Sequence, residues 1–436
     1  MKLFDLSLKL AGFPMKEATK HFAEILSIPE NEYEAFIEQK KAEIVQFHLE
    51  HNSFYRDLCK DKNVENWNDL PILTKADLQQ PLSQRLSDGY TEKNVFVNKT
   101  SGSSGTPFIF AKDKFSHALT WASIIHRFDW FGINFNHSYQ ARFYGIPLDF
   151  IGNKKERIKD VLSNRFRFTV FDLSDKVLEK VLVKFQHKKF DYINGYTSSI
   201  VLFAKFLQQR NLILNSICPT LKCCVVTSEM LFEEDKTLLE KQFGIPVVNE
   251  YGASELDLIA FQNTKGEWQV NSETIYIEIL DDENRILPNG KEGRVVITSL
   301  YNKANPFIRY DIGDIGIIDE KSTSKKAILK KLVGRTSDIA ILPSGKKSPG
   351  LTFYYVTKSI IEDDGNVKEF VVKQTKIDTF EIEYASEKIL SDKQIETIKF
   401  AISKYLEPGL QFNFIHKEKL ERSKSGKLKQ FVSLVK

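Results

Sequence analysis

The sequence predicts an α/β protein with a large N-terminal part and a smaller α+β part at its C-terminus. At 436 residues the chain is longer than one hydrophobic core usually supports, so two domains are expected. Between about residues 95 and 335, short apolar runs alternate with helix-length stretches, which is typical of an α/β core. After residue 338 the order of strands and helices changes, and this predicts a small separate domain.

The large domain is expected over residues 1–337, and its first 90 residues are expected to be a mainly helical covering part. Amphipathic stretches at 17–27 and 31–50 predict helices, and prolines mark the segment that follows. In the core, strands are expected at 94–97, 192–195, 223–227, 246–249, 275–280 and 294–299, and helices at 174–187, 197–210 and 232–243. The polar, turn-rich stretch 281–293 predicts a hairpin connection.

The small domain is expected over residues 338–436. Helices are predicted at 351–361 and 391–406, and strands at 366–375, 379–385 and 410–416. This alternation is typical of a compact α+β domain.

Composition and charge exclude several classes of protein. A net charge of +4 is small for this length and gives no electrostatic reason to expect a nucleic-acid partner. No apolar run approaches the ~18–20 residues that cross a bilayer, and the N-terminus lacks the apolar core of a signal peptide, so a cytoplasmic protein is expected. The four cysteines have no metal-ligand spacing.

A Ser/Gly/Thr-rich loop, residues 99–107, directly follows the first expected strand of the core. Its two glycines let backbone N–H groups approach an anion, and its hydroxyl groups can donate to phosphate oxygens. It lacks the Gly-Lys-Ser/Thr end of a Walker motif. By itself, the loop fits a polyphosphate site and an ordinary surface loop equally well.

A second segment, residues 249–255, follows the strand at 246–249. In it Tyr251 can lie against a flat base, and Glu255 can hold Mg²⁺. The same residues are equally consistent with a helix that begins at an N-capping Ser254, with Glu255 in its first turn.

Three further segments carry polar groups suited to a nucleotide. Asp314, at the end of the segment 309–314, can accept from two ribose hydroxyls, and Arg335 in the segment 334–338 can bond the same sugar or a phosphate. Lys427, in the Gly-Lys tip of residues 423–427, can carry an ammonium group into a cleft. Taken singly, the segments 309–314 and 334–338 are equally consistent with a turn and a surface charge, and the segment 423–427 is equally consistent with a basic tail.

All five segments occur together and in order, and this order resembles the acyl-adenylate-forming superfamily. The resemblance is narrower to its phenylacetate-coenzyme A ligase-like branch, which includes the CapK-like relatives of capsular polysaccharide biosynthesis. It runs from about residue 95 to the C-terminus and includes residues 193–198 and 226–231. It implies a large adenylate-forming domain followed by a mobile lid domain.

The resemblance also implies roles for individual residues. Tyr251 stacks near adenine, Glu255 holds Mg²⁺ in a catalytic role, Asp314 and Arg335 bond the ribose, Asp338 is the hinge, and Lys427 is the catalytic lysine between the carboxylate and the α-phosphate. The implied nucleotide-binding residues further comprise Thr100, Ser101, Gly102, Ser103, Ser104, Gly105, Thr106, Glu250, Gly252, Ala253 and Ser254. The implied acyl pocket comprises Gly195, Tyr196 and Ser228, near residues 142–150. Arg142 there can pair a polar or anionic substrate or serve only the structure.

The sequence departs from this family in two places. Many phenylacetate-coenzyme A ligase relatives have metal-binding cysteine and histidine residues where this chain has 260–268 and 329–333, and neither stretch contains them, so no structural zinc is expected. Thr106 also stands where many relatives have lysine, which places more of the phosphate binding on backbone and hydroxyl donors.

The resemblance implies an enzyme that uses ATP and Mg²⁺ to convert a carboxylic acid to its acyl-AMP, with release of pyrophosphate. Coenzyme A is the first expected acyl acceptor. An amine acceptor, in an amide-forming ligase of surface polysaccharide biosynthesis, is the alternative, and a non-catalytic nucleotide-binding regulator is a lesser one. A monomer or a homodimer is expected.

Overall fold

The structure is a computed structural model that describes residues 3–100, 108–145, 150–335, 339–345, 347–349, 367–386, 388–405, 407–422 and 428–435. The chain divides into two compact units: residues 1–312 with 317–331, and residues 313–316 with 332–436. The mixed α/β class predicted from the sequence is confirmed. The expected boundary at 337/338 falls outside the described residues, so the domain limits stay a prediction.

Helices dominate the first 90 residues of the first unit. Their bounds are α1 Leu3–Leu10, α2 Met15–Ser27, α3 Glu30–His51, α4 Ser53–Leu58 and α5 Leu82–Arg85, with 3-10 turns at Trp67–Asp69 and Asp77–Gln79. The predicted helices at 17–27 and 31–50 correspond to α2 and α3. Among the described residues no helix has the length and apolar character of a membrane span.

A two-stranded antiparallel hairpin and a helix come next in the chain. The hairpin consists of β1 (Phe96–Lys99) and β2 (Ile109–Lys112), and the helix is α6 (Lys114–Asp129). Asp113 caps α6, because its Oδ1 accepts from the backbone N–H groups of Phe115 at 3.0 Å and Ser116 at 2.9 Å. The strand β2 therefore runs directly into a capped helix.

A seven-stranded sheet forms the centre of the first unit, in the order β4-β3-β5-β6-β7-β8-β9. The first five of these strands are parallel, and β8 and β9 are added antiparallel. The strands are β3 Gln140–Phe143, β4 Arg165–Phe168, β5 Tyr192–Tyr196, β6 Cys223–Thr227, β7 Val247–Ala253, β8 Asp257–Gln262 and β9 Trp268–Val270. The helices between them are α7 Phe150–Leu162, α8 Asp175–His187, α9 Thr197–Gln209, α10 Leu214–Ile217 and α11 Glu233–Phe243.

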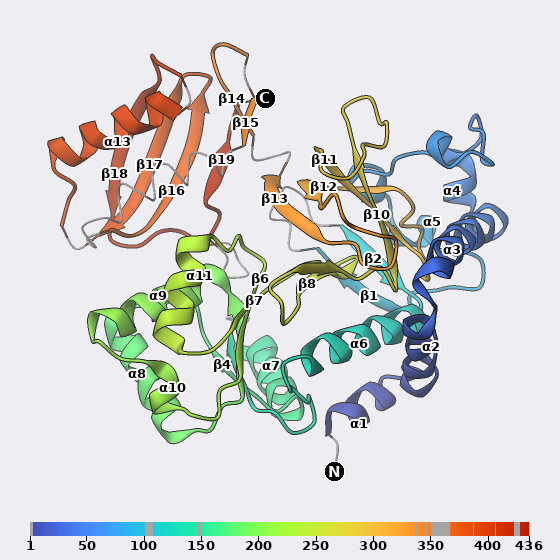
Figure 1. The fold of residues 1–436 in the computed structure, drawn as a ribbon, viewed down its shortest axis with the longest axis horizontal. Coiled ribbons are helices and arrows are strands. Elements are labelled where there is room, and N and C mark those ends of the chain that lie inside the picture. The colour runs from blue at the N-terminus through green and yellow to red at the C-terminus, as the bar shows by residue number, and fades with distance from the viewer. Residues whose placement is uncertain are drawn as a thin grey trace. The chain divides into compact units, whose positions relative to one another are not determined.

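Helices cover both faces of this sheet, as Figure 1 shows. On one face, residues of α8, α9 and α11 such as Leu182, Phe203 and Leu239 form one core cluster with the odd-numbered residues of β3 and β5. On the other face, Phe128 of α6 packs in a cluster with Tyr192 of β5. Burial on both faces explains why β5, β6 and β7 are predicted as short apolar runs, whereas no strand was expected at β3, β4, β8 or β9.

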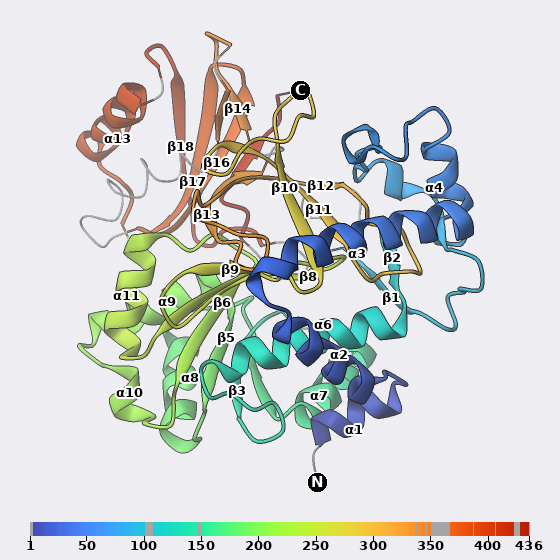
Figure 2. The same ribbon diagram turned by 45° about the vertical axis from the view of Figure 1, so that its right-hand side comes forward.

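A second sheet has the order β10-β11-β12-β13, with strands Ile275–Leu280, Glu292–Ser299, Tyr310–Ile318 and Leu329–Arg335. The antiparallel pairing of β10 with β11 confirms the hairpin predicted around 281–293. The long helix α3, seen crossing in Figure 2, packs against this part of the unit through Tyr33 and Ile37, which cluster with Leu300. The division between the two units passes through β12 and β13.

The second unit contains a four-stranded sheet in the order β18-β17-β16-β19. Its elements are β14 Ile339–Ile341, β15 Lys347–Pro349, β16 Val367–Lys376, β17 Thr379–Ser386, α13 Asp392–Tyr405, β18 Gln411–Lys417 and β19 Phe431–Ser433. The predicted strands at 366–375, 379–385 and 410–416 and the helix at 391–406 are confirmed. The helix predicted at 351–361 lies outside the described residues.

Candidate active site

The carboxyl ends of three parallel strands, β5, β6 and β7, bring the predicted acyl and nucleotide segments together. Strand register places Tyr196 of β5 beside Thr227 of β6, and Thr227 beside Glu250 of β7. Gly195 precedes Tyr196, and Ser228 follows Thr227 in the left-handed region at φ 70°. Open α/β sheets bind ligands at this edge. The predicted acyl-pocket residues are therefore neighbours of the segment that begins at Glu250.

Gly195 of β5 pairs with Phe143 of β3 at a close approach of the two strands. A Cβ atom built on Gly195 would lie 2.4 Å from the carbonyl oxygen of Phe143 and 2.6 Å from its Cβ, so no larger residue fits without moving β3. The next residue, Tyr196, is 5% exposed, and its ring centroid lies 4.5 Å from that of Tyr144. The sequence here fixes a close strand pair with two aromatic rings at its end.

The segment after β6 is held to the start of α9. The backbone N–H of Ser198 donates to Oε2 of Glu229 at 2.7 Å, and the hydroxyl of Thr197 donates to the carbonyl oxygen of Glu229 at 3.2 Å. A carboxylate at a helix N-terminus is stabilised by the unpaired N–H groups there. This contact fixes the path of the chain that leaves Ser228.

Tyr251, Gly252 and Ala253 end β7, where a register shift between Tyr251 and Gly252 marks an irregular pairing with β8. A Cβ atom on Gly252 would lie 2.4 Å from the carbonyl oxygen of Asp257, so this position also requires glycine. The Tyr251 ring is 8% exposed and lies edge-on to Trp268, with 5.9 Å between centroids.

The alternative of a helix that begins at Ser254 is wrong. The chain makes a short turn after Ala253, with the N–H of Leu256 donating to the carbonyl oxygen of Ala253 at 3.1 Å. It then returns as the antiparallel strand β8 from Asp257. Pairing with β7 outweighs the local preference of serine for a helix start, because the strand pair satisfies the same backbone groups.

Glu255 occupies this turn and is 6% exposed. The hydroxyl of Tyr310, the first residue of β12, donates to its Oε1 at 2.9 Å. No hydrogen bond to Oε2 is made by any residue that the structure describes. A carboxylate fixed through one oxygen, with the second available, suits a hard cation such as Mg²⁺.

Sequence reasoning missed Lys112 and Asp257, which fix the same turn from its other side. The side chain of Lys112 is 4% exposed and forms an ion pair with Asp257. Its Nζ also donates to the carbonyl oxygen of Ser254 at 3.3 Å, and Asp257 lies in the left-handed region at φ 58°. No local signal could have revealed this contact, because 142 positions separate Lys112 from Ser254.

Lys112 also connects this turn to the predicted phosphate loop, because β2 is the strand that follows the loop. At the base of the loop, the N–H of Thr100 donates to the carbonyl oxygen of Phe108 at 3.0 Å, and the N–H of Phe108 donates to Oγ1 of Thr100 at 3.1 Å. Ser101, Gly102, Ser103, Ser104, Gly105 and Thr106 lie outside the described residues. The ion pair therefore holds the hairpin that carries the loop against the turn that carries Glu255.

Buried ionisable groups surround the turn. Burial raises the pKa of Glu250, while a hydrogen bond from Thr227 and the charge of Arg142 act in the opposite direction. Burial also lowers the pKa of His117 to about 4. Its ring stacks on Phe96 with 3.9 Å between centroids, so His117 is a neutral packing residue near pH 7.

The remaining predicted site residues belong to the second unit. Asp314 is 3% exposed on β12, and Arg335 is the last residue of β13, with its side chain outside the described part. Asp338 and Lys427 lie outside the described residues altogether. Their roles stay predictions, and so does the expected absence of zinc. Over the ranges that the structure describes, no three His, Cys, Asp or Glu residues form a metal-binding cluster.

Comparison with known proteins identifies the relatives of this chain. No family model matches it. Protein CapK of Staphylococcus aureus is 23% identical over 357 residues, covering 76% of this chain and 75% of CapK. The phenylacetate-coenzyme A ligase of Thermus thermophilus is 22% identical over 451 aligned positions, covering 94% of this chain and 98% of that ligase.

Solved structures agree in fold. Crystal structures of 2-hydroxyisobutyryl-CoA ligase match in two states. With 2-HIB-AMP in the postadenylation state the TM-score is 0.71 at 16% identity, over 93% of this chain and 90% of that one. For the complex with 2-HIB-AMP and CoA in the thioesterification state, the TM-score is 0.59 at 17% identity. That match covers 94% of this chain and 91% of the ligase chain. The chain is thus a distant homologue of CapK and the phenylacetate-coenzyme A ligases and belongs to the adenylate-forming ligase superfamily.

Proposed function

We propose that this chain activates a carboxylic acid with ATP to form an acyl-AMP and pyrophosphate, and then transfers the acyl group to coenzyme A. The observation that carries the proposal is the turn bearing Glu255, which is fixed by Tyr310 on one side and by Lys112 on the other. The same turn follows Tyr251 at the sheet edge where the acyl segments end. Distant homology to ligases of this superfamily supports the same reading.

In the first step, a carboxylate oxygen of the substrate attacks the α-phosphorus of ATP. A new P–O bond forms, the bond between the α-phosphorus and the oxygen that bridges to the β-phosphate breaks, and pyrophosphate leaves. Negative charge develops around the phosphorus, and positioned cationic groups stabilise it. Lys427 is the proposed ammonium group, and the loop from Thr100 to Thr106 is the proposed phosphate cradle.

Glu255 would hold Mg²⁺, which when bound supplies charge neutralisation to the phosphates. Tyr310 orients the carboxylate for this task, since its hydrogen bond fixes one of the two oxygens. Tyr251 would lie against the adenine, and Asp314 and Arg335 would bond the ribose.

In the second step, the thiol of coenzyme A attacks the acyl carbonyl. A thioester bond forms, the bond to AMP breaks, and the thiol proton passes to solvent. One cleft then serves two reactions, which favours a second unit that changes position about Asp338.

Carboxylate-dependent exchange of pyrophosphate into ATP tests the first step. Lys427→Ala should abolish the exchange while ATP binding persists, and Lys424→Ala, in the same Ser-Lys-Ser-Gly-Lys segment, is the matched control. Full exchange in Lys427→Ala would refute the role of that lysine. Measuring AMP formation with coenzyme A or with an amino acid as the acceptor then identifies the second substrate: turnover with the amino acid alone would replace thioester formation by amide formation.

A further inference from the structure

A row of polar side chains crosses one face of the central sheet near its carboxyl edge. Strand register aligns Arg142 of β3 with Asn194 of β5 and, two positions farther along the strands, Thr227 of β6 with Glu250 of β7. The row continues the face that holds Tyr192, because side chains two positions apart point the same way. Parallel strands buried on both faces are normally apolar there. This row therefore has a function other than packing.

Within the row, the amides of Gln140 and Asn194 are paired. Nε2 of Gln140 donates to Oδ1 of Asn194 at 3.3 Å, and Nδ2 of Asn194 donates to the carbonyl oxygen of Val225 at 3.2 Å. Both residues are 5% exposed. These amides are hydrogen-bonded to each other and to the backbone, so they form a fixed polar surface beside Arg142.

Arg142 differs from its neighbours Arg165 and Arg167, because its Nε is buried and has no hydrogen-bond partner among the residues that the structure describes. The part of the chain that the structure describes makes no ion pair with it. Its guanidinium carbon lies 3.9 Å from the centroid of the Tyr144 ring, which orients the side chain without supplying an acceptor. Burial raises the pKa of the nearby Glu250 carboxyl, which takes its hydrogen bond from Thr227, and the charge of Arg142 opposes that rise.

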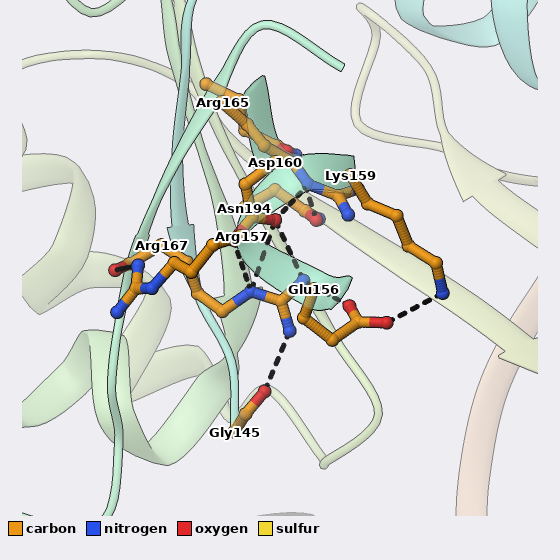
Figure 3. Close-up of polar contacts among 9 residues, drawn as sticks. Gly145, Glu156, Arg157, Lys159, Asp160, Arg165, Arg167 and Asn194 are labelled. Atoms are coloured by element: carbon orange, nitrogen blue, oxygen red, sulfur yellow. Dashed lines mark hydrogen bonds and ion pairs between the residues drawn. The ribbon is translucent and has the colours of Figure 1, made fainter. Parts of the chain in front are cut away.

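The adjacent arginines do not share this property. Figure 3 shows Arg167, the register partner of Arg142, with Nη2 donating to Oε2 of Glu156 at 2.8 Å and to Oδ1 of Asp160 at 2.9 Å. Arg165 donates to Oδ1 of Asp160 at 2.6 Å. Arg167 also donates to the carbonyl oxygen of Gly145 at 2.9 Å, which fixes the backbone next to Tyr144. The acids of α7 are therefore committed to partners other than Arg142.

We infer that Arg142 binds a second carboxylate of the acyl substrate, so that the acid activated by this protein is a dicarboxylic acid. The inference rests on the proposed function and names its substrate class. A guanidinium offers a planar fork that matches a carboxylate. The guanidinium of Arg142 lies over the ring of Tyr144, and that ring contacts Tyr196 of the acyl segment, so the second carboxylate would lie close to the acyl segment.

Matched pairs of acids test the inference in the pyrophosphate exchange assay: propionate with malonate, butyrate with succinate, and phenylacetate with 4-carboxyphenylacetate. At least one dicarboxylate should exceed its monocarboxylate by tenfold or more in kcat/KM. Arg142→Met should lower kcat/KM for that dicarboxylate by about 10- to 100-fold, the usual worth of a hydrogen bond to a charged group. The KM for ATP should stay unchanged, and Arg142→Lys should restore part of the preference.

Arg210→Met is the matched control, because the guanidinium carbon of Arg210 lies 3.6 Å from the ring centroid of Phe206 at the end of α9. This variant removes the same kind of arginine-aromatic contact and should leave the ratio between paired acids unchanged. Equal activity toward both members of every pair in the wild type would overturn the inference. So would an equal loss for both members in Arg142→Met, or a raised KM for ATP.

Acid binding provides a readout that does not depend on adenylation. The preferred dicarboxylate should raise the Tm of the wild-type protein, and of Arg210→Met, but not of Arg142→Met. If this shift in Tm occurs without any pyrophosphate exchange, the result supports the carboxylate site and refutes the proposed ligase activity. If no acid of the panel shifts the Tm and none of the dicarboxylates is preferred, the carboxylate site is refuted.

Discussion

Arg309→Met should destabilise the first unit by about 3–5 kcal/mol, because it leaves a buried carboxylate without its counter-charge. Arg309 is fully buried, and its Nη2 lies 3.3 Å from Oε1 of Glu278, which is equally buried. Its Nη1 donates to the carbonyl oxygens of Trp67 at 3.1 Å, Asn68 at 2.9 Å and Leu70 at 3.2 Å. Methionine fills most of the space but supplies neither charge nor donors.

The geometry of the ion pair between Arg309 and Glu278 is far from ideal, and this leads to an expectation for the double variant. The Nη2 of Arg309 lies at ion-pair distance from Glu278 but without hydrogen-bond geometry, and within the described ranges Oε2 of Glu278 has no hydrogen-bond partner. Glu278→Gln combined with Arg309→Met should therefore recover much of the loss, since both charges are then removed. A total stability of about 5–15 kcal/mol makes the single replacement a large fraction of the whole.

The loss should depend on pH in a defined direction. Burial raises the pKa of Glu278 above its ordinary value of 4.5, and Arg309 opposes that rise. Without Arg309 the folded-state pKa rises further. A carboxyl with a raised folded-state pKa contributes its full stability below its unfolded pKa and loses it as pH rises through the folded value. The free energy of unfolding of Arg309→Met should therefore be closer to that of the wild type at pH 5 than at pH 8.

Urea unfolding followed by tryptophan fluorescence measures this, because all four tryptophans, residues 67, 121, 130 and 268, lie in the first unit. Arg285→Met removes an exposed ion pair with Asp281 and should leave the transition unchanged. A loss below about 1 kcal/mol for Arg309→Met at pH 8 would refute the reasoning, given the range expected for a broken buried pair. A loss that grows toward pH 5, or a double variant less stable than the single one, would do the same.

Three further outcomes follow from contacts in the first unit. Tyr310→Phe removes the donor to Glu255, so half-maximal pyrophosphate exchange should need about three- to tenfold more Mg²⁺; an unchanged Mg²⁺ titration would contradict this. Burial lowers the pKa of His48 from 6.5 to about 4, so stability should fall as pH drops from 6.5 toward 4. His48→Gln should lessen that fall in urea unfolding, and an unaltered pH profile would count against it. Burial raises the pKa of Cys223 to about 12, so its thiol should resist Ellman's reagent at pH 8 until urea is added, whereas rapid labelling of the native protein would show the thiol to be accessible.

The sequence was sufficient for the elements with the clearest local pattern. The strands Cys223–Thr227 and Ile275–Leu280 have the bounds predicted for them, and α9 and α11 agree to within a residue at either end. Continuous apolar runs and helical periodicity carry that information locally. The turn after Ala253 was ambiguous for the opposite reason, because Ser254 and Glu255 fit a helix start and a strand reversal equally well. Pairing with a distant strand decided between them.

The polar row shows what a single sequence leaves out. The sequence of each strand shows which of its side chains alternate between the two faces of the sheet. The register between neighbouring strands decides which of these side chains share a face. A slip of one residue between β3 and β5 would bring Phe143 to the polar face and turn Arg142 into the apolar cluster that contains Ile193. The contact of Phe143 with Gly195, too close to admit even a Cβ atom, holds the observed phase. Arg142 reaches the polar face because the contact between Phe143 and Gly195 fixes where β3 lies, so the role of Arg142 depends on the fold rather than on its neighbours in the chain.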